Sequence, residues 1–402
     1  MPKIADHVPA GAIVTYDYFD QPGFKEDPHA VIMRLFEGRT PRIFYTPLNG
    51  GHWVIGGYQE LFDAARDTQT FSSTSMQIPA MSDEPLLVPL NMDPPDHGVY
   101  RAALNKAFTP ARIVRMEDGV RKLADELIDQ VAGSGGTEFV SAISEPLPVF
   151  VFMEIAGIPR EHFRAFRDNV FTFLSDPDAT KRSQALSFFH RELGSLIAQK
   201  RAAPQDDLLS QLATSDVNGR PISDEELMGF CILLMFAGLD TVTNAMSLGV
   251  RHLASDQELQ ARLRSDASLI PAAVEELLRR YAFASMGRIV MRDTEFHGLA
   301  MKKGDRVLFV PAAAGLDPET YNDPLAVVLD RKEKGVPTFG FGPHRCVGMH
   351  LARLELRVLY EQWLSRIPAF SLSPSSPPRF HGGIVIGLET LHLEWATVPS
   401  VR

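Results

Sequence analysis

The sequence predicts a mainly α-helical protein with small β-sheets, on the strength of three observations. Apolar residues recur at helical spacing through most of the chain, capping signals mark helix starts, and β-rich runs are short and few. The longest predicted helix has the clearest start, because Ser223-Asp224-Glu225-Glu226 is a capping box. We expect it to continue to about residue 254, to be on the order of 45 Å long, and to cross the centre of the protein.

The other predicted elements follow from local patterns. Residues 28–37 have a helical pattern, and the β-rich runs 42–46 and 52–55 flank Asn49-Gly50, a strong hairpin signal. An apolar helix face recurs between residues 113 and 131. Further helices are predicted near residues 146–156, 160–174, 181–201 and 206–214 and from about 271, and β structure near 289–310 and 381–396.

Length and composition limit the classes of protein to which the chain can belong. No Ser/Gly-rich or charged linker divides the 402 residues, so we expect one domain over residues 1–402. The net charge of −10 argues against a general nucleic-acid binder. Cys231 and Cys346 suggest no disulfide framework, which fits a reducing cytoplasm. No signal-peptide core and no run of membrane-spanning length is expected, so we predict a cytoplasmic protein without a membrane segment.

Residues 339–348 form the most informative segment, Phe-Gly-Phe-Gly-Pro-His-Arg-Cys-Val-Gly, directly before a helical pattern. Its glycines allow backbone amides to approach the Cys346 sulfur, and the following helix adds the positive end of its dipole, so both effects favour a thiolate. Such a thiolate suits an axial ligand of haem iron. The alternatives are a packed structural cysteine, or a metal site of His344, Cys346 and His350, which lacks a fourth ligand nearby.

Two motifs carry a resemblance to a known family. Phe339, Gly342, Cys346 and Gly348 fill every fixed position of Phe-x-x-Gly-x-x-x-Cys-x-Gly, and the chain thereby resembles the cytochrome P450 family. The segment from Ala237 to Thr241 is similar to the Ala-Gly-x-Asp-Thr segment of that family. The likeness covers nearly the whole chain and is greatest to the bacterial camphor 5-monooxygenase group. It implies the cytochrome P450 fold, the cofactor haem b (iron protoporphyrin IX), and Cys346 as the ligand of its iron.

The second motif is unusual for an apolar helix. Gly238 costs about 1 kcal/mol relative to alanine, and Asp240 and Thr241 place an acid and a hydroxyl among apolar neighbours. A bend or a satisfied ion pair would also account for these residues. The resemblance implies that Thr241 hydrogen-bonds the oxygen substrate and organises water, that Asp240 relays protons, and that Ala237 and Gly238 lie against the haem.

The resemblance also assigns cofactor contacts to side chains that would otherwise be ordinary surface cations. The expected partners of the two haem propionates are His97, Arg101, Arg288 and His344. Met286 replaces a polar family residue near this group, so the anchoring is expected to differ locally. Glu276 and Arg279 share a helix face, and with Arg331 they would form a structural triad beneath the haem.

The pocket positions implied by the resemblance are apolar. They are Met76, Pro85, Leu87, Leu90, Leu233, Phe236, Ala237, Ala284, Ile384 and Val385. A compact hydrophobic substrate held by shape fits this set. The camphor enzyme has a tyrosine where this chain has Pro85, which has no hydroxyl to donate to a ketone, so camphor specificity is not expected. We predict a monoterpenoid: a cyclic ether, ketone or hydrocarbon.

The resemblance implies a monooxygenase that hydroxylates this substrate with O₂. No Gly-x-Gly-x-x-Gly follows a predicted strand, so electrons are expected from a separate [2Fe–2S] ferredoxin and its reductase, which Arg101, Arg345 and Arg353 would attract. Three alternatives remain. They are a haem-thiolate peroxygenase or isomerase, a non-catalytic haem sensor or ligand-binding protein, and an all-α protein without a cofactor.

Overall fold

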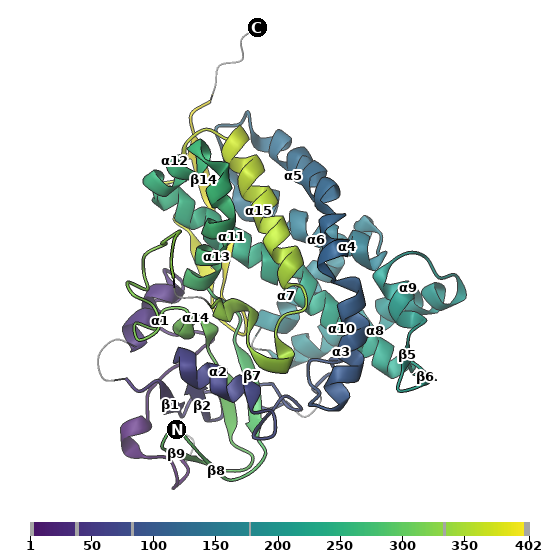
Figure 1. The fold of residues 1–402 in the computed structure, drawn as a ribbon, viewed down its shortest axis with the longest axis vertical. Helices are drawn as coiled ribbons and strands as arrows, with labels where there is room; N and C mark the ends of the chain where they lie inside the picture. The colour runs from purple at the N-terminus through teal and green to yellow at the C-terminus, as the bar shows by residue number, and fades with distance from the viewer. Residues whose placement is uncertain (1–3, 37–39, 82–83, 177, 333–334, 398–402) are drawn as a thin grey trace.

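The computed structural model describes residues 4–36, 40–81, 84–176, 178–332 and 335–397. Helices make up most of it, and the largest sheet lies at one end, in the lower part of Figure 1. The helices are α1 (Pro28–Phe36), α2 (Tyr58–Arg66), α3 (Asp96–Ala107), α4 (Pro110–Val114), α5 (Glu117–Val131), α6 (Pro146–Ala156), α7 (Phe163–Ser175), α8 (Ala179–Ala202), α9 (Leu208–Ala213), α10 (Asp224–Leu239), α11 (Thr241–Ser255), α12 (Gln257–Ser265), α13 (Ile270–Arg280), α14 (Pro311–Ala314) and α15 (Met349–Arg366).

The strands form one five-stranded sheet and several smaller ones, so the predicted mainly α fold with small sheets is confirmed. The larger sheet has the order β1-β2-β10-β7-β3, and the smaller ones are β11-β14-β4 and the pairs β12-β13, β5-β6 and β8-β9. The strands are β1 (Ile43–Thr46), β2 (His52–Ile55), β3 (Phe71–Ser72), β4 (Gly136–Glu138), β5 (Asp216–Val217), β6 (Arg220–Pro221), β7 (Met286–Val290), β8 (Thr294–Phe296), β9 (Leu299–Met301), β10 (Arg306–Phe309), β11 (Phe370–Leu372), β12 (Arg379–His381), β13 (Gly387–Thr390) and β14 (His392–Trp395).

The predicted hairpin is confirmed. β1 and β2 pair antiparallel with Ile43 opposite Ile55, and the turn between them has φ of 53° at Asn49 and 88° at Gly50. Asn and Gly tolerate this left-handed backbone better than other residues do. β10 lies parallel to β2 and antiparallel to β7. Because β3 pairs with the other edge of β7, β7 also lies inside the sheet. The sheet therefore holds the residues of β7 in fixed positions.

The central element is two consecutive helices rather than one. The capping box is formed: the Ser223 hydroxyl accepts from Glu226 N, and the Glu226 carboxylate accepts from Ser223 N. α10 nevertheless ends at Leu239, and α11 begins at Thr241. The prediction of one uninterrupted helix is wrong at Asp240 (φ −128°, ψ −36°), where polar side chains compete for the backbone groups of the helix.

The α10–α11 stretch is also apolar enough to cross a bilayer by length and composition. Over Asp224–Ser255, the best window has a mean hydropathy of 1.6, so the expectation that no run reaches spanning length is wrong. Of that window, 56% is buried inside the protein, as is usual for the core helix of a globular fold. α10 packs against α6, α7 and α8, and α11 packs against α13 and α15.

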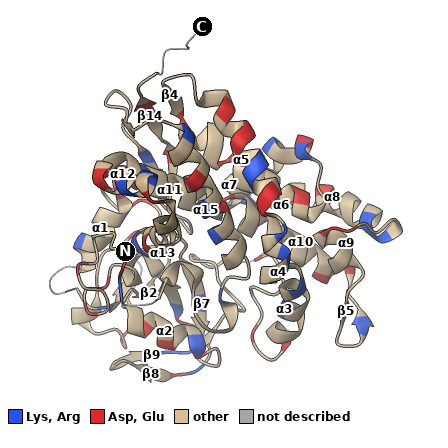
Figure 2. Ribbon diagram, turned by 45° about the horizontal axis from the view of Figure 1, so that its top comes forward, with Lys and Arg blue, Asp and Glu red and all other residues tan. Residues whose placement is uncertain are grey.

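α15, which follows the cysteine loop, is the second core helix and packs along α5 (Figure 1). Trp363 and Leu359 are fully buried on it. Charged residues of both signs lie on α5 (Figure 2), and Arg357 and Glu361 of α15 pair with Glu117 and Arg121 at 2.6 and 2.7 Å. These pairs are partly exposed and each contributes about 0–1 kcal/mol, so buried packing is what mainly joins the two helices.

Candidate active site

The loop before α15 presents the thiol of Cys346 in a fixed position. Cys346 N donates to the Phe339 carbonyl at 2.8 Å, which closes the loop on itself. Gly342 has φ of +67°, and a Cβ there would lie 2.4 Å from the Ala65 carbonyl oxygen, so only glycine fits. The N–H of Gly348 donates toward the sulfur, one residue before α15 begins. The loop therefore has the rigidity and the amide contact that the sequence predicts.

The predicted preference for thiolate is wrong for the metal-free protein. Burial raises the pKa of Cys346, and this effect outweighs the Gly348 amide and the charges of Arg101, Arg353 and Arg345, which lower it. The error arises because the sequence shows the stabilising groups and not how closely protein atoms surround the sulfur. A metal ion bound to the sulfur would remove the thiol proton outright.

Solvent reaches the side chain of Cys346, although protein atoms crowd it on most sides. Ala237, in the middle of the α10–α11 stretch, is likewise exposed. A reachable thiol and small residues on the core helix fit the flat macrocycle of haem, which needs one face near the ligand and room beside it.

The four cations expected at the haem propionates lie near one another. The ring centroids of His97 and His344 are 4.2 Å apart. Burial, together with the charges of Arg288, His97 and Arg101, lowers the pKa of His344 to about 3. Burial, together with the charge of Arg101, also lowers the pKa of His97. The structure thus brings all four predicted residues into one electrostatic group.

Among the described residues, no member of this group forms an ion pair, although the nearby Asp93 carboxylate favours the charged forms of His97 and Arg288. His97 Nε2 is buried without a hydrogen-bond partner among the described residues. Arg288 is 5% exposed and forms no ion pair in the described part of the chain; it donates to the Gly287 carbonyl. Buried donors of this kind need anionic acceptors, and the two carboxylates of haem would provide them. The donor set therefore fits the cofactor.

Two further residues at this group were not predicted. The Ser73 hydroxyl lies 3.1 Å from His344 Nε2, and Ser73 N donates to Asp93 at 2.9 Å. Asp93 adjoins the segment that holds His97, so its position in the sequence was informative. No motif in the sequence indicated Ser73, because only the folding of the chain brings it to the cysteine loop.

Asp240 and Thr241 stand at the break between α10 and α11. Burial raises the pKa of Asp240, while the charges of His381 and Arg167 and a hydrogen bond from Asn244 lower it. Asn244 Nδ2 donates to Asp240 Oδ2 at 3.1 Å. The Thr241 hydroxyl donates to the Ala237 carbonyl at 2.7 Å, which satisfies a carbonyl near the end of α10. The contacts of Asp240 with Asn244 and His381 were not predicted.

The predicted pocket positions meet through close backbone contacts. Residues 84–90 lie against α10 at Gly229, where a Cβ would be 2.7 Å from the Leu86 carbonyl oxygen. Met76 lies against β7 at Gly287, where a Cβ would be 1.9 Å from the Met76 carbonyl oxygen. Ala284 and Val385 pair in a β-bridge. Met76, Pro85, Leu87, Leu90, Leu233, Phe236, Ile384 and their neighbours thus come from segments that pack on one another.

An aromatic cluster beside these positions was not predicted. Phe236 of α10 stacks on Phe173 of α7 with centroids 4.4 Å apart, and Phe189 of α8 meets it edge-on at 5.4 Å. In the sequence, Phe173 and Phe189 have the apolar helical spacing of ordinary core residues. The cluster reduces the space available over α10.

The predicted triad is present. Arg279 Nε and Arg331 Nε each donate to one oxygen of Glu276 at 2.9 Å, and the three side chains are 1%, 5% and 8% exposed, respectively. Arg353 pairs with Glu275 and lies 4.5 Å over the ring of Phe339. These contacts tie α13 to the cysteine loop.

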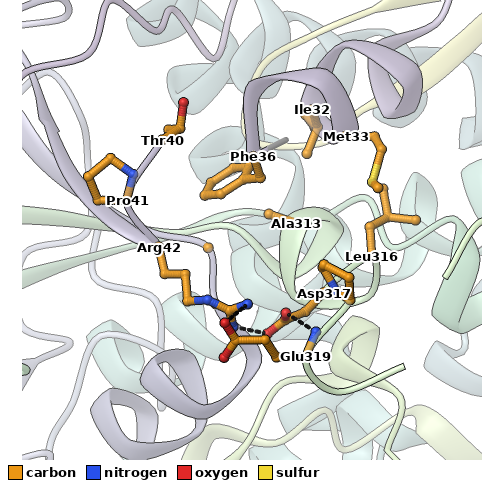
Figure 3. Close-up of a pocket in the computed structure, with 13 residues that line it drawn as sticks. Ile32, Met33, Phe36, Thr40, Pro41, Arg42, Ala313, Leu316, Asp317 and Glu319 are labelled. Atoms are coloured by element: carbon orange, nitrogen blue, oxygen red, sulfur yellow. Dashed lines mark hydrogen bonds and ion pairs between the residues drawn. The ribbon is translucent and has the colours of Figure 1, made fainter. Parts of the chain in front are cut away.

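Two other features do not form a reaction site. Among the described residues, no three His, Cys, Asp or Glu side chains are placed to hold a metal ion, which argues against the alternative site of His344, Cys346 and His350. A cavity of about 590 Å³ lies between α1 and α14 (Figure 3). Its one guanidinium, Arg42, is occupied by Asp317 at 2.6 Å and Glu319 at 2.9 Å, and none of the predicted site residues lines it.

Comparisons with known proteins agree with this geometry. The family model described as Cytochrome P450 matches residues 152–390. The chain is 32% identical over 98% of its length to "Probable cytochrome P450 127A1" of Sinorhizobium fredii, of which 97% is covered. It is 33% identical over 86% of its length to "Steroid C26-monooxygenase" of Mycobacterium tuberculosis (95% covered). The crystal structures of CYP101J2 (33% identity) and CYP101C1 (31%) superpose with a TM-score of 0.90, covering 98% of this chain and 100% of theirs.

Proposed function

The chain belongs to the cytochrome P450 family, and from this premise we propose that it hydroxylates a monoterpenoid with O₂ and electrons from a ferredoxin. Its family makes it a haem b monooxygenase. When bound, haem b supplies the O₂ activation and the oxidation of the C–H bond. The observation that carries the proposal is Cys346, a solvent-accessible thiol close to Arg101 and to the buried residues His97 and Arg288, which form no ion pair among the described residues.

The residues of this chain would hold the cofactor from two sides. Cys346 would ligate the iron as thiolate, with the Gly348 amide stabilising its charge. The propionates would accept from His97, Arg101, Arg288 and His344. Ala237 is a small, exposed residue of the core helix and would leave room for the ring. The expected contact of Gly238 with haem is not supported, because a Cβ of Gly238 would lie 2.6 Å from the ring of Phe152. The triad of Glu276, Arg279 and Arg331 would hold α13 in a fixed position.

Asp240 and Thr241 would handle protons. Burial raises the pKa of Asp240, which favours the protonated carboxyl that a proton donor needs. The Thr241 hydroxyl donates to the Ala237 carbonyl, so its remaining lone pairs can accept a hydrogen bond from water. Together they would deliver protons without flooding the site with solvent.

The substrate class follows from shape and polarity. Pro85 is buried and has no side-chain hydrogen-bond donor. The rings of Phe173 and Phe189 pack against the ring of Phe236. A small apolar guest fits these walls better than a large one. The name of one relative refers to a steroid, which makes steroids the competing class.

A titration of the ferric protein tests the substrate class. We expect a terpene ether and a terpene hydrocarbon to shift the iron from low to high spin, and a steroid to leave it low-spin. Pro85→Tyr should tighten camphor binding about three- to tenfold relative to a terpene hydrocarbon, because one hydrogen bond is gained. Leu86→Tyr, at the exposed neighbouring position, is the control. A full shift with the steroid alone, or no change from Pro85→Tyr, would overturn the assignment.

The electron donor would be a [2Fe–2S] ferredoxin with its reductase, in the cytoplasm. The chain is acidic overall, yet Arg101, Arg345 and Arg353 surround the cysteine and can attract an acidic partner. Arg353 is paired with Glu275, whereas Arg345 is exposed, so Arg345 is the best placed of the three. Product formation with peroxide alone would favour a peroxygenase instead, and stable ligand binding without product would favour a sensor.

A further inference from the structure

A small cavity lies beside Asp240, between α7, the start of α11 and the β12–β13 hairpin. Its volume is about 100 Å³. Since one water occupies about 30 Å³ in the liquid, it has room for about three waters. Asp240, Thr243, Asn244 and His381 line it.

The Thr243 hydroxyl indicates that this cavity is wet. The side chain is 7% exposed, and its Oγ1 has no hydrogen-bond partner among the described residues. Leaving a buried hydroxyl unsatisfied costs about 1–3 kcal/mol, so a water in the adjacent cavity is the expected partner. Asp240, Asn244 and His381 supply the further polar contacts that such a water needs.

His381 and Asp240 approach each other through Asn244. His381 Nε2 and Asn244 Oδ1 both lie within 2.5 Å of the point where a Cβ of Gly387 would stand, so only glycine permits this approach. The amide of Asn244 donates to Asp240 Oδ2 at 3.1 Å. His381 is half-buried at the end of β12 and so contacts both the cavity and solvent.

Among the charged and titratable groups around the cavity, the Asp240 carboxyl and the His381 imidazole are available to interact with each other. The other charged groups there are already paired: Arg167 with Glu145 and Asp168, and Glu389 with Arg379. No ion pair is formed by Asp240 or His381 in the described part of the chain. Histidine changes its charge between about pH 5 and 8, which suits proton exchange with water.

We propose that this cavity is the proton intake of the enzyme, in which His381 takes up protons from solvent and passes them through water to Asp240. The inference rests on the proposed function, in which Asp240 relays protons. For each proton that Asp240 releases, water carries one from His381 Nε2 to the carboxylate, and His381 takes a replacement from solvent. No electrons move in this exchange. His381 is therefore a positioning residue that acts through Asp240.

The test compares His381→Phe and His381→Gln with the exposed-residue control His190→Phe. His381→Phe retains a ring beside Phe171, whose centroid lies 5.6 Å away, but cannot carry a proton. We expect both His381 variants to form about three- to tenfold less product per electron pair at pH 7. They should also have a larger solvent isotope effect than the wild type. A merely structural role would leave the isotope effect unchanged.

A second measurement does not depend on turnover. The ring resonances of His381 are compared by NMR at one pH between wild type and Asp240→Asn. We expect their chemical shifts to change in the variant, because Asp240 and His381 line the same cavity. Unchanged shifts, or His381 variants with the wild-type isotope effect, would overturn the proposal. A wild type that forms no product would instead refute the proposed function, and the NMR comparison would then decide whether the pair interacts.

Discussion

The imidazoles of His97, on α3, and His344, in the cysteine loop, lie with their centroids 4.2 Å apart. Burial lowers the pKa of both rings, and to about 3 for His344. Two buried rings this close to each other and to Arg288 cannot both carry charge unless anions are present. The pair is therefore complete only with an anionic ligand, and haem has two carboxylates.

Replacing these rings should weaken the hold on haem. We expect His97→Gln and His344→Gln each to speed haem loss about tenfold, because each removes a hydrogen bond to a charged group worth about 1.5–3 kcal/mol. Transfer of haem to an excess of apomyoglobin measures the rate. His190→Gln, on the exposed face of α8, is the control and should lose haem at the wild-type rate. Equal rates in all four proteins would remove the pair from the cofactor site.

Glu276 should matter far more for stability than its neighbour Glu275. Glu276→Gln leaves Arg279, 1% exposed, without its counter-charge, and breaking a buried pair costs about 3–5 kcal/mol. Glu275→Gln disturbs only a pair with Arg353 whose side chains are 42% and 25% exposed, at a cost of about 0–1 kcal/mol. Urea unfolding of both variants checks the contrast. Similar losses in the two would contradict the structural role of the triad.

Because of Glu355, the free energy of unfolding of the protein should fall as the pH rises. It is fully buried on α15, its Oε2 has no partner among the described residues, and burial raises its pKa well above the usual value. The folded protein therefore keeps a proton that the unfolded chain releases above about pH 4.3, so stability falls by about 1.4 kcal/mol per pH unit from there up to the folded pKa. Glu355→Gln should remove this slope in unfolding experiments at pH 5 to 8. Parallel wild-type and variant profiles would show that Glu355 is ionised in the fold.

Arg345 should contribute to reduction by ferredoxin and not to haem binding. Its side chain is exposed beside Cys346, so Arg345→Glu should slow ferredoxin-driven reduction at least tenfold at low salt, while reduction by dithionite is unchanged. Arg262→Glu is the control, because Arg262 is an exposed residue of α12. This helix contacts the C-terminal end of α15. That end lies about 25 Å along α15 from the cysteine loop. Unaltered ferredoxin kinetics in Arg345→Glu would place the docking surface elsewhere.

Local signals predicted most of the elements and the residues of the site. The capping box at Ser223, the hairpin at Asn49-Gly50 and the limits of α6 depend on contacts within a few residues, and all three are confirmed. The cations expected at the haem carboxylates followed from the resemblance of their segments to a known family. The structure adds that they lie near one another, and their contact with haem stays a prediction.

The errors and omissions arise from tertiary surroundings. At the break at Asp240, the Thr241 hydroxyl donates to the Ala237 carbonyl, and hydrophobic periodicity does not register this competition with the helix backbone. The raised pKa of Cys346 depends on atoms from distant segments. His381 reaches the Asp240 cavity only because Gly387 allows close approach, and no motif contains it.

The central claim is that Cys346 binds haem iron as a thiolate. The most direct test is the absorption spectrum of the purified protein, reduced under carbon monoxide, for wild type and for Cys346→His. We predict a strongly red-shifted Soret band in the wild type, because the thiolate donates electron density to the iron, and its loss in the variant. A wild type that lacks a haem band, or a carbonyl complex without the red shift, would contradict the account.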